Sequence, residues 1–552
     1  MNQAWWKEAV VYQIYPKSFK DTTGSGTGDL KGVMSKLDYL KELGVDVIWL
    51  TPVYQSPQHD NGYDISDYYS IDESYGTMED FEELLHETHK RDMKLIMDLV
   101  INHTSTEHEW FKQSASSKDN EYRDFYIWKD AVDGKEPNNW QSKFGGPAWD
   151  YDEKTDQYYL HLFDKTQADL NWENEKVRQK LYEMIGFWAK KGIDGFRLDV
   201  INLISKNQEF PNDDIGDGRR FYTDGPRIHE FLQEMNEAVL APYQLMTVGE
   251  MSSTTLDSCI LYTQADRKEL DMTFQFHHLK VDYPNGEKWT KAPFDFIQLK
   301  EILTHWQVGM DEGDGWNALF WCNHDQPRIV SRLGNDEKYH EESAKMLATT
   351  IHMMNGTPYI YQGEEFGMTN PKFETIDDYR DVESLNAYQL MKESGKPDQE
   401  IMSILQQKSR DNSRTPMHWS ADQQAGFTTG TPWIPLAANY PEINVEAAVA
   451  DKNSVFYHYQ ALIALRKKYD IIVQGDYQPL LDNHQHVFAY TRNWNSEKIL
   501  VVSNFYAEEV TVNFSDEKRK EIEIILSNYP DSTTEIDEVT LRPYESIVYY
   551  LR

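Results

Sequence analysis

Charged side chains stand where a buried strand is expected, in the segment GIDGFRLDV at residues 192–200. Its apolar residues alternate with Arg197 and Asp199, which is the two-residue period of a β-strand. The two charges therefore share one face of the strand, where burial costs free energy unless something recovers it. Because a nearby arginine lowers the pKa of a carboxyl group, Arg197 is expected to hold Asp199 ionised. The pair suits a positioned, charged nucleophile.

Other polar residues also stand at the carboxyl ends of candidate strands. They are Asp98, Asn102 and His103 after one strand, Glu250 at the end of another, and Asn323, His324 and Asp325 after a third. A single carboxylate there is more often a cap or an ion-pair partner, but several from different strands indicate one site. Converging carboxylates suit cleavage of a glycosidic bond, in which one attacks the sugar and another protonates the leaving oxygen.

The elements that would position these residues alternate between strands and helices. Eight apolar runs read as strands, at residues 9–16, 45–52, 94–100, 194–200, 245–251, 271–276, 317–323 and 358–365. Amphipathic stretches between them, such as 78–92, 177–192 and 342–354, read as helices. This alternation predicts an α/β fold, a (β/α)8 TIM barrel, with a doubly wound open sheet as the structural rival.

Two regions depart from the alternating pattern. The aromatic, loop-rich interval at 104–172 predicts a subdomain inserted after strand 3. Alternating runs beyond a helix at 454–468 predict a C-terminal antiparallel β-domain at 479–552. The catalytic barrel is then expected to comprise 1–103 and 173–478.

Composition indicates a globular chain. The 552 residues are 39% hydrophobic and 13% aromatic, with a formal net charge of −37. Such an acidic chain is not expected to bind nucleic acid or an anionic membrane. We see no signal peptide, no transmembrane run, and no pairing or metal spacing in the two cysteines. We therefore expect a cytoplasmic protein, while its oligomeric state stays open.

Four segments, DLVINH, GFRLDVIN, VGEM and NHD, resemble the signature segments of the α-amylase-type glycoside hydrolases. The resemblance covers essentially the whole chain. It implies that Asp199 is the nucleophile, Glu250 the general acid/base, and Asp325 a third carboxylate that binds sugar hydroxyls. By the same resemblance, His103 and His324 would bind hydroxyls of the glucose that is cleaved off.

The resemblance also implies how the pocket for that glucose is built. Asp60 and Tyr63 in SPQHDNGYD would close the pocket and stack under the ring. Phe163 and Gln167 would reach it from the inserted subdomain. An arginine is expected against Asp60; RDNSRTPMHW offers Arg410 and Arg414, of which we prefer Arg414.

A pocket closed beyond one glucose implies a retaining exo-α-glucosidase, and Val200 after the nucleophile resembles enzymes that cut α-1,6 or α-1,1 bonds. Within the family, FHHLKVDYPNGEKW is similar to the phospho-α-(1,1)-glucosidases, which implies hydrolysis of trehalose 6-phosphate to glucose and glucose 6-phosphate. Neutral oligo-1,6-glucosidases and sucrose isomerases remain the alternative. A catalytically silent transporter subunit is disfavoured, because the carboxylates are kept and no membrane helix is present.

A cluster of lysines distinguishes the phosphorylated substrate from the neutral ones. Lys280, Lys288 and Lys291 lie within 12 residues, although solvated lysines alone would explain that. In a chain of charge −37, a phosphate dianion needs cations within roughly a Debye length, about 8 Å. The resemblance assigns phosphate binding to lysines that we place at Lys280 and Lys291, whereas neutral sugars need none.

No cofactor is expected for this chemistry. Relatives often carry a calcium loop of the form D-x-N-x-D-G-x-G-D, but this chain has DTTGSGTGD at 21–29, with Thr23 and Ser25 at two of the usual ligand positions. Calcium prefers roughly six to eight oxygen ligands, commonly carboxylates. Asp21 and Asp29 alone are therefore expected to hold it poorly.

Overall fold

The computed structural model describes residues 4–552, which divide into two compact units. The first unit comprises residues up to 48, 277–380 and 395–552, and the second comprises 49–276 and 381–394. One eight-stranded sheet has the order β13-β12-β11-β5-β2-β1-β15-β14. Its strands are β1 (Val11–Ile14), β2 (Val47–Leu50), β5 (Lys94–Leu99), β11 (Gly195–Leu198), β12 (Met246–Glu250), β13 (Met272–Phe274), β14 (Ala318–Leu319) and β15 (Thr357–Tyr361). All eight strand predictions are confirmed.

The strands pair in parallel within each unit. In the second unit β5, β11, β12 and β13 are neighbours, and in the first β1 and β14 both pair with β15. Every residue of β11 and β12 is buried, as expected where helices cover both faces of a parallel sheet. Gly195 opens β11 because an added Cβ would lie 2.1 Å from the Met246 carbonyl oxygen.

The long helices of the second unit begin and end at recognisable capping residues. The Thr77 and Asp80 side chains form a capping box on α3 (Met78–His89). Asn174 caps α5 (Glu175–Lys191), which ends at Gly192 in the left-handed region. The other α-helices of this unit are α4 (Glu109–Ser114), α6 (Arg219–Tyr222), α7 (Ile228–Met235), α8 (Leu256–Thr263) and α12 (Val382–Glu393).

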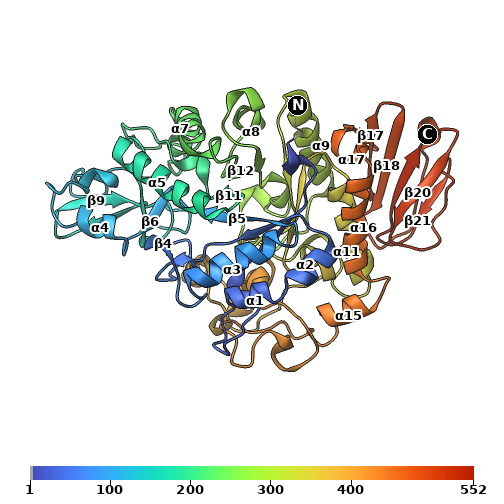
Figure 1. Cartoon of the computed structure of the whole chain (residues 1–552), viewed down its shortest axis with the longest axis horizontal. Coiled ribbons are helices and arrows are strands. Elements are labelled where there is room, and N and C mark those ends of the chain that lie inside the picture. Colours follow the sequence, from blue (N-terminus) through green and yellow to red (C-terminus); the bar gives the residue numbers. More distant parts are fainter. Residues whose placement is uncertain (1–3) are drawn as a thin grey trace. The chain divides into compact units, whose positions relative to one another are not determined.

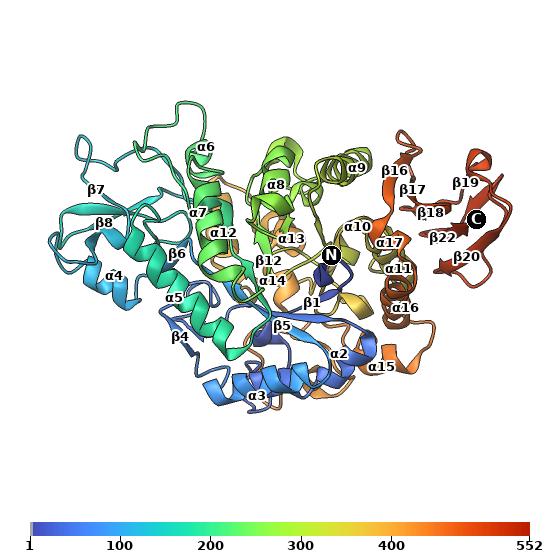
Figure 2. The same ribbon diagram turned by 45° about the horizontal axis from the view of Figure 1, so that its top comes forward.

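Small antiparallel sheets lie in the region between β5 and β11. They are formed by β6 (His103–Ser105) with β10 (Gln167–Asp169), and by β7 (Trp128–Lys129), β8 (Trp149–Asp152) and β9 (Gln157–Leu160). Phe111 of α4 stacks on Trp128 and meets Tyr159 edge to face, which joins the helix to the three-stranded sheet. Figure 2 shows α4 next to β8 of this sheet. A further pair, β3 (Tyr54–Gln55) and β4 (Asp67–Ile71), precedes α3.

The first unit contains the remaining α-helices. They are α1 (Leu30–Met34), α2 (Leu37–Leu43), α9 (Phe296–Glu312), α10 (Ile329–Leu333), α11 (His340–His352), α13 (Asp398–Lys408), α14 (Asp411–Arg414), α15 (Val445–Ala450), α16 (Val455–Lys468) and α17 (Ile471–Gln474). Asp29 caps α1 by accepting the Gly32 backbone N–H. No helix within residues 4–552 is long and apolar enough to cross a membrane.

The chain ends in antiparallel strands (Figure 1, red). The five-stranded sheet has the order β16-β17-β18-β22-β20, and β19 pairs with β21. These strands are β16 (Asp476–Leu480), β17 (Val487–Trp494), β18 (Glu497–Asn504), β19 (Val510–Val512), β20 (Ile522–Ser527), β21 (Val539–Leu541) and β22 (Ser546–Leu551). Their alternate residues form one apolar core, including Val487, Ala489, Leu500 and Val502. The domain boundaries at 103/104, 172/173 and 478/479 stay a prediction.

Candidate active site

Arg197 lies at the centre of a buried cluster of carboxylates in the second unit. Its Nη1 is 2.7 Å from both Asp98 Oδ1 and Asp199 Oδ1, and its Nη2 is 2.5 Å from Glu250 Oε2. Asp98 is the register partner of Arg197 on β5, and Glu250 is the last residue of β12. The three strands therefore bring together two of the three predicted catalytic carboxylates around one guanidinium.

In this cluster the one guanidinium of Arg197 contacts three buried carboxyl groups. Burial raises the pKa of Asp199, the Arg197 guanidinium lowers it, and Asp98 raises it further. Arg197 thus acts in the expected direction, but its charge is shared and the net shift of the Asp199 pKa is upward. A hydrogen bond with Glu250 also lowers the pKa of Asp199, so the two carboxyl groups interact directly with each other's charge state.

Asp98 anchors the cluster, a role that we did not predict beyond its place at a strand end. Its Oδ2 accepts hydrogen bonds from Tyr63 Oη at 2.9 Å and Trp49 Nε1 at 3.1 Å. Burial raises the pKa of Asp98 too, against the opposing effects of Arg197 and the Tyr63 hydrogen bond. One carboxylate thereby holds both the guanidinium and the predicted stacking ring in place.

Val200 follows Asp199 in a strained backbone conformation. Strand β11 ends at Leu198, so Asp199 and Val200 lie just beyond it. Val200 has φ 38° and ψ 40°, a left-handed conformation that is rare for a β-branched residue. Its backbone N–H donates to Glu250 Oε2 at 3.2 Å. The turn therefore connects the backbone after the predicted nucleophile to the predicted acid.

The predicted sugar-pocket residues of the second unit also come together. Gln167 Nε2 donates to Asp60 Oδ2 at 3.0 Å and to the Tyr63 carbonyl at 3.3 Å, and it lies 3.4 Å from His103 Nε2. The Phe163 ring is 5.1 Å from the His103 ring. The pairing of β6 with β10 explains this grouping, because His103 and Gln167 stand on adjacent strands.

His103 is held as a neutral hydrogen-bonding group. Burial lowers the pKa of His103 to about 4. The Asn102 amide contacts His103 Nδ1 at 3.2 Å, and His103 Nε2 lies 3.2 Å from the Tyr63 carbonyl. Because the carbonyl can only accept, Nε2 carries the proton and Nδ1 accepts from Asn102. The ring keeps a fixed orientation without a charge at neutral pH.

The third predicted carboxylate, Asp325, lies in the first unit among basic groups. Its Oδ1 is 2.6 Å from Arg414 Nη2 and 3.2 Å from Arg410 Nη1. His324 Nε2 is 3.3 Å from Asp325 Oδ2, and Arg414 Nε donates to the His324 carbonyl. Both arginines considered for Asp60 thus bind Asp325, and the pairing of Arg414 with Asp60 stays a prediction.

His324 is oriented by residues of β1 and of the segment just after it, and we did not predict these contacts. Gln13 Nε2 is 2.8 Å from His324 Nδ1, and the Tyr15 ring stacks on the imidazole at a centroid distance of 6.0 Å. An amide N–H donates, so His324 Nδ1 accepts and Nε2 carries the proton toward Asp325. The polar Gln13 inside an apolar strand was the signal that could have identified this contact.

The two predicted phosphate lysines have different surroundings. Lys280 is exposed directly after the 3-10 turn His277–Leu279. Lys291 lines a cavity of about 340 Å³ whose other lining residues are Asp282, Ala292, Pro293, Phe294, Ser331, Arg332, Asn370 and Gln407. Asp282 there binds Arg332 at 2.8 Å and Lys408 at 2.6 Å. Lys291 and Arg332 against the one lining carboxylate of Asp282 leave this cavity positive within an acidic chain.

Comparisons with known proteins identify the family of this chain. The model for the alpha amylase catalytic domain matches residues 13–475, and that for the alpha-amylase SusG C-terminal domain matches 487–548. The chain belongs to the alpha-amylase family. The predicted family and the predicted fold, a (β/α)8 barrel with a C-terminal antiparallel β-domain, are confirmed.

Similar proteins within this family include two of the activities that the sequence left open. Trehalose-6-phosphate hydrolase of Bacillus subtilis (strain 168) is 66% identical over 551 residues, covering 99% of this chain and 98% of that protein. Oligo-1,6-glucosidase of Bacillus cereus is 56% identical over 559 residues, covering 100% of both. The crystal structure of Bacillus licheniformis trehalose-6-phosphate hydrolase aligns with a TM-score of 0.96 at 65% identity, covering 99% of both chains.

Proposed function

We propose that this chain is a retaining exo-α-glucosidase that hydrolyses trehalose 6-phosphate to glucose and glucose 6-phosphate. The similarity to trehalose-6-phosphate hydrolase over nearly the full length is the observation that carries this proposal. The positive cavity at Lys291 supports the phosphorylated substrate, because a phosphate dianion needs local cations in an acidic chain. Phosphorylated disaccharides occur inside cells, so we place the protein in the cytoplasm.

The arrangement of the two carboxyl groups supports cleavage with retention. Asp199 and Glu250 bind the same guanidinium and share a hydrogen bond. An inverting glycosidase needs its two carboxyl groups about 6.5–9.5 Å apart, with a water between the base and the sugar. Two carboxyl groups on one guanidinium fit the shorter separation of retaining enzymes, roughly 5–5.5 Å. The pair suits a nucleophile and an adjacent acid.

The proposed reaction proceeds in two steps. Asp199 attacks the anomeric carbon of the non-phosphorylated glucose while Glu250 donates its proton to the glycosidic oxygen, and glucose 6-phosphate leaves. Glu250, now ionised, takes a proton from water, and that water displaces Asp199 from the sugar to release glucose. Asp325 binds sugar hydroxyls in this scheme, and Lys280 and Lys291 bind the phosphate. No step needs a metal or an organic cofactor.

Proton NMR of the first turnovers tests this proposal. Trehalose 6-phosphate is expected to give equal amounts of the two products, with the new glucose appearing as the α-anomer before mutarotation. Glucose appearing first as the β-anomer would exclude the proposed two-step mechanism. Release of one product without the other would exclude the proposed reaction.

Neutral α-1,6-glucosidase activity is the second candidate, favoured by the 56% identity to oligo-1,6-glucosidase of Bacillus cereus. The same carboxylates would serve it, because both substrates present an unphosphorylated α-glucosyl unit whose anomeric carbon is attacked. Isomaltose is therefore the appropriate competing substrate. A neutral sugar gains nothing from the Lys291 cavity, so charge removal there separates the two activities.

A further inference from the structure

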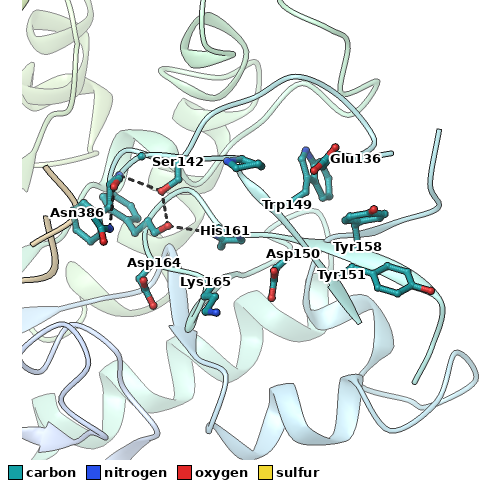
Figure 3. A pocket seen from close by; sticks show the side chains of 14 residues that line it. Glu136, Ser142, Trp149, Asp150, Tyr151, Tyr158, His161, Asp164, Lys165 and Asn386 are labelled. Atoms are coloured by element: carbon teal, nitrogen blue, oxygen red, sulfur yellow. Dashed lines mark hydrogen bonds between the residues drawn. The ribbon is translucent and has the colours of Figure 1, made fainter. Parts of the chain in front are cut away.

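A cavity of about 490 Å³ lies on the region between β5 and β11, with one lining residue, Asn386, from α12 (Figure 3). Its volume falls within the range of about 300–1,000 Å³ that small-molecule sites occupy. The described mechanism uses none of its lining residues except Phe163. The chemistry of its walls indicates what it can bind.

Aromatic side chains from two paired strands form part of the lining. Tyr151 of β8 and Tyr158 of β9 are register partners, and their ring centroids are 5.2 Å apart. Trp149 stands two residues before Tyr151 and donates its indole N–H to Asn138 at 2.7 Å. Because Trp149 is only 3% exposed, the ring of Tyr151, which is 44% exposed, is the larger aromatic surface offered to a ligand. Such rings pack against the C–H faces of pyranoses.

A buried histidine adds a directed acceptor to the same cavity. His161 is 6% exposed, lines the cavity, and its Nδ1 lies 2.9 Å from the Phe163 carbonyl (Figure 3). The carbonyl can only accept, so Nδ1 carries the proton and Nε2 of the neutral ring carries a lone pair. A sugar hydroxyl is the kind of donor that this lone pair fits.

The charges of the lining select against phosphate. Glu136, Asp150 and Asp164 are opposed by Lys165 alone, so four ionised lining groups sum to −2. A phosphorylated sugar is repelled here, whereas the carboxylates accept hydrogen bonds from neutral hydroxyls. This is the reverse of the cavity at Lys291.

We propose that this cavity is a second carbohydrate site that binds a neutral pyranoside such as glucose. Phe163 is a wall of the cavity, and its ring lies 5.1 Å from His103, so the bound sugar would lie next to the glucose pocket proposed above. The inference stands on the lining residues and does not require that the substrate be phosphorylated.

Ligand-observed saturation-transfer NMR with methyl α-glucoside tests the proposal. All proteins would carry Asp199→Asn to prevent turnover, and trehalose 6-phosphate would be added to occupy the active site. Tyr151→Ala removes one wall of the cavity, and His161→Phe removes the acceptor while keeping a ring. Tyr243→Ala is the matched control, because Tyr243 is 40% exposed against 44% for Tyr151 and does not line the cavity.

Transfer that persists with trehalose 6-phosphate present, falls at least threefold in Tyr151→Ala and is unchanged in Tyr243→Ala would support the site. Glucose 6-phosphate should give weaker transfer than methyl α-glucoside. Equal transfer in the two tyrosine variants overturns the proposal even if His161→Phe fails to fold. If adding trehalose 6-phosphate lowers the saturation transfer to methyl α-glucoside in no variant, the proposed substrate is wrong. The comparison of the two tyrosine variants still tests the cavity.

Discussion

Asp199 and Glu250 contact the same arginine, and the position of one proton distinguishes their roles. A hydrogen bond with Glu250 lowers the pKa of Asp199, which favours Asp199 as the ionised member of the pair. The effect of losing Glu250, the proposed acid, should therefore depend on the leaving group, because only a poor leaving group needs protonation.

Glu250→Gln is expected to slow release of glucose 6-phosphate from trehalose 6-phosphate by about 10²–10⁴-fold, the usual contribution of a general acid. p-Nitrophenyl α-glucoside, whose leaving group needs no proton, should keep a near-normal burst of p-nitrophenol in stopped-flow measurements. Glu237→Gln, at an exposed position on the same unit, is the control. Equal losses on the two substrates would contradict the assignment of Glu250.

The acid limb of the pH profile tests the charge balance around Asp199. Asp199 must be ionised to attack, so activity is lost as pH falls through its raised pKa. Because Asp98 contributes to that increase, Asp98→Asn should lower the pKa of Asp199 and move the acid limb of kcat/KM to lower pH. The exposed Asp257→Asn variant should leave the limb in place. An upward shift in Asp98→Asn would contradict this account.

At the scale of elements, a buried ion pair ties the segment after Asp199 to strand β10. Lys206 Nζ lies 2.9 Å from Asp169 Oδ2, with both side chains at most 1% exposed. Lys206 also donates to Asn102 Oδ1 at 3.1 Å, next to His103. The pair therefore joins the segment after Asp199, the proposed nucleophile, to the strands that position the proposed sugar pocket.

Lys206→Met should lower the free energy of unfolding by about 3–5 kcal/mol, because it leaves the Asp169 carboxylate buried without a cation. Urea denaturation followed by tryptophan fluorescence measures the change. Lys176→Met, on the exposed start of α5, should change the free energy by less than about 0.5 kcal/mol. Comparable effects of the two substitutions would show that the buried pair is not important for stability.

The loop at 21–29 uses its two carboxylates within its own fold. Asp21 accepts the backbone N–H groups of Thr23, Gly24 and Gly26. Asp29 accepts from Gly32 N–H as the cap of α1 and also binds Thr22. These donors already satisfy the oxygens that a calcium ion would need, which supports our proposal that the loop needs no ion.

Chelation is accordingly expected to have no effect on stability or activity. The thermal unfolding midpoint should be the same with excess EDTA as with added calcium, within experimental error. The same holds for kcat/KM. Asp21→Asn should lower the midpoint equally under both conditions, because it weakens hydrogen bonds rather than a metal site. An increase of several degrees with calcium would contradict the proposal.

At the scale of the whole molecule, the sequence predicted the strands better than the contacts between distant residues. Eight apolar runs were sufficient to place the parallel strands, because burial on both faces requires such runs. The contact of Gln13 with His324 joins residues 311 positions apart, and the polar Gln13 in an apolar strand marks one end of it without identifying the other. The upward shift of the Asp199 pKa likewise depends on how three strands share Arg197.

The central claim is that this chain prefers a phosphorylated disaccharide to a neutral one. The ratio of kcat/KM for trehalose 6-phosphate to that for isomaltose measures this preference. We predict a large ratio in the wild type and in Lys288→Ala. In Lys280→Ala/Lys291→Ala the ratio should fall by at least tenfold, through trehalose 6-phosphate alone. A wild-type ratio near or below one, unchanged by the lysine substitutions, would contradict the account and identify a neutral α-1,6-glucosidase.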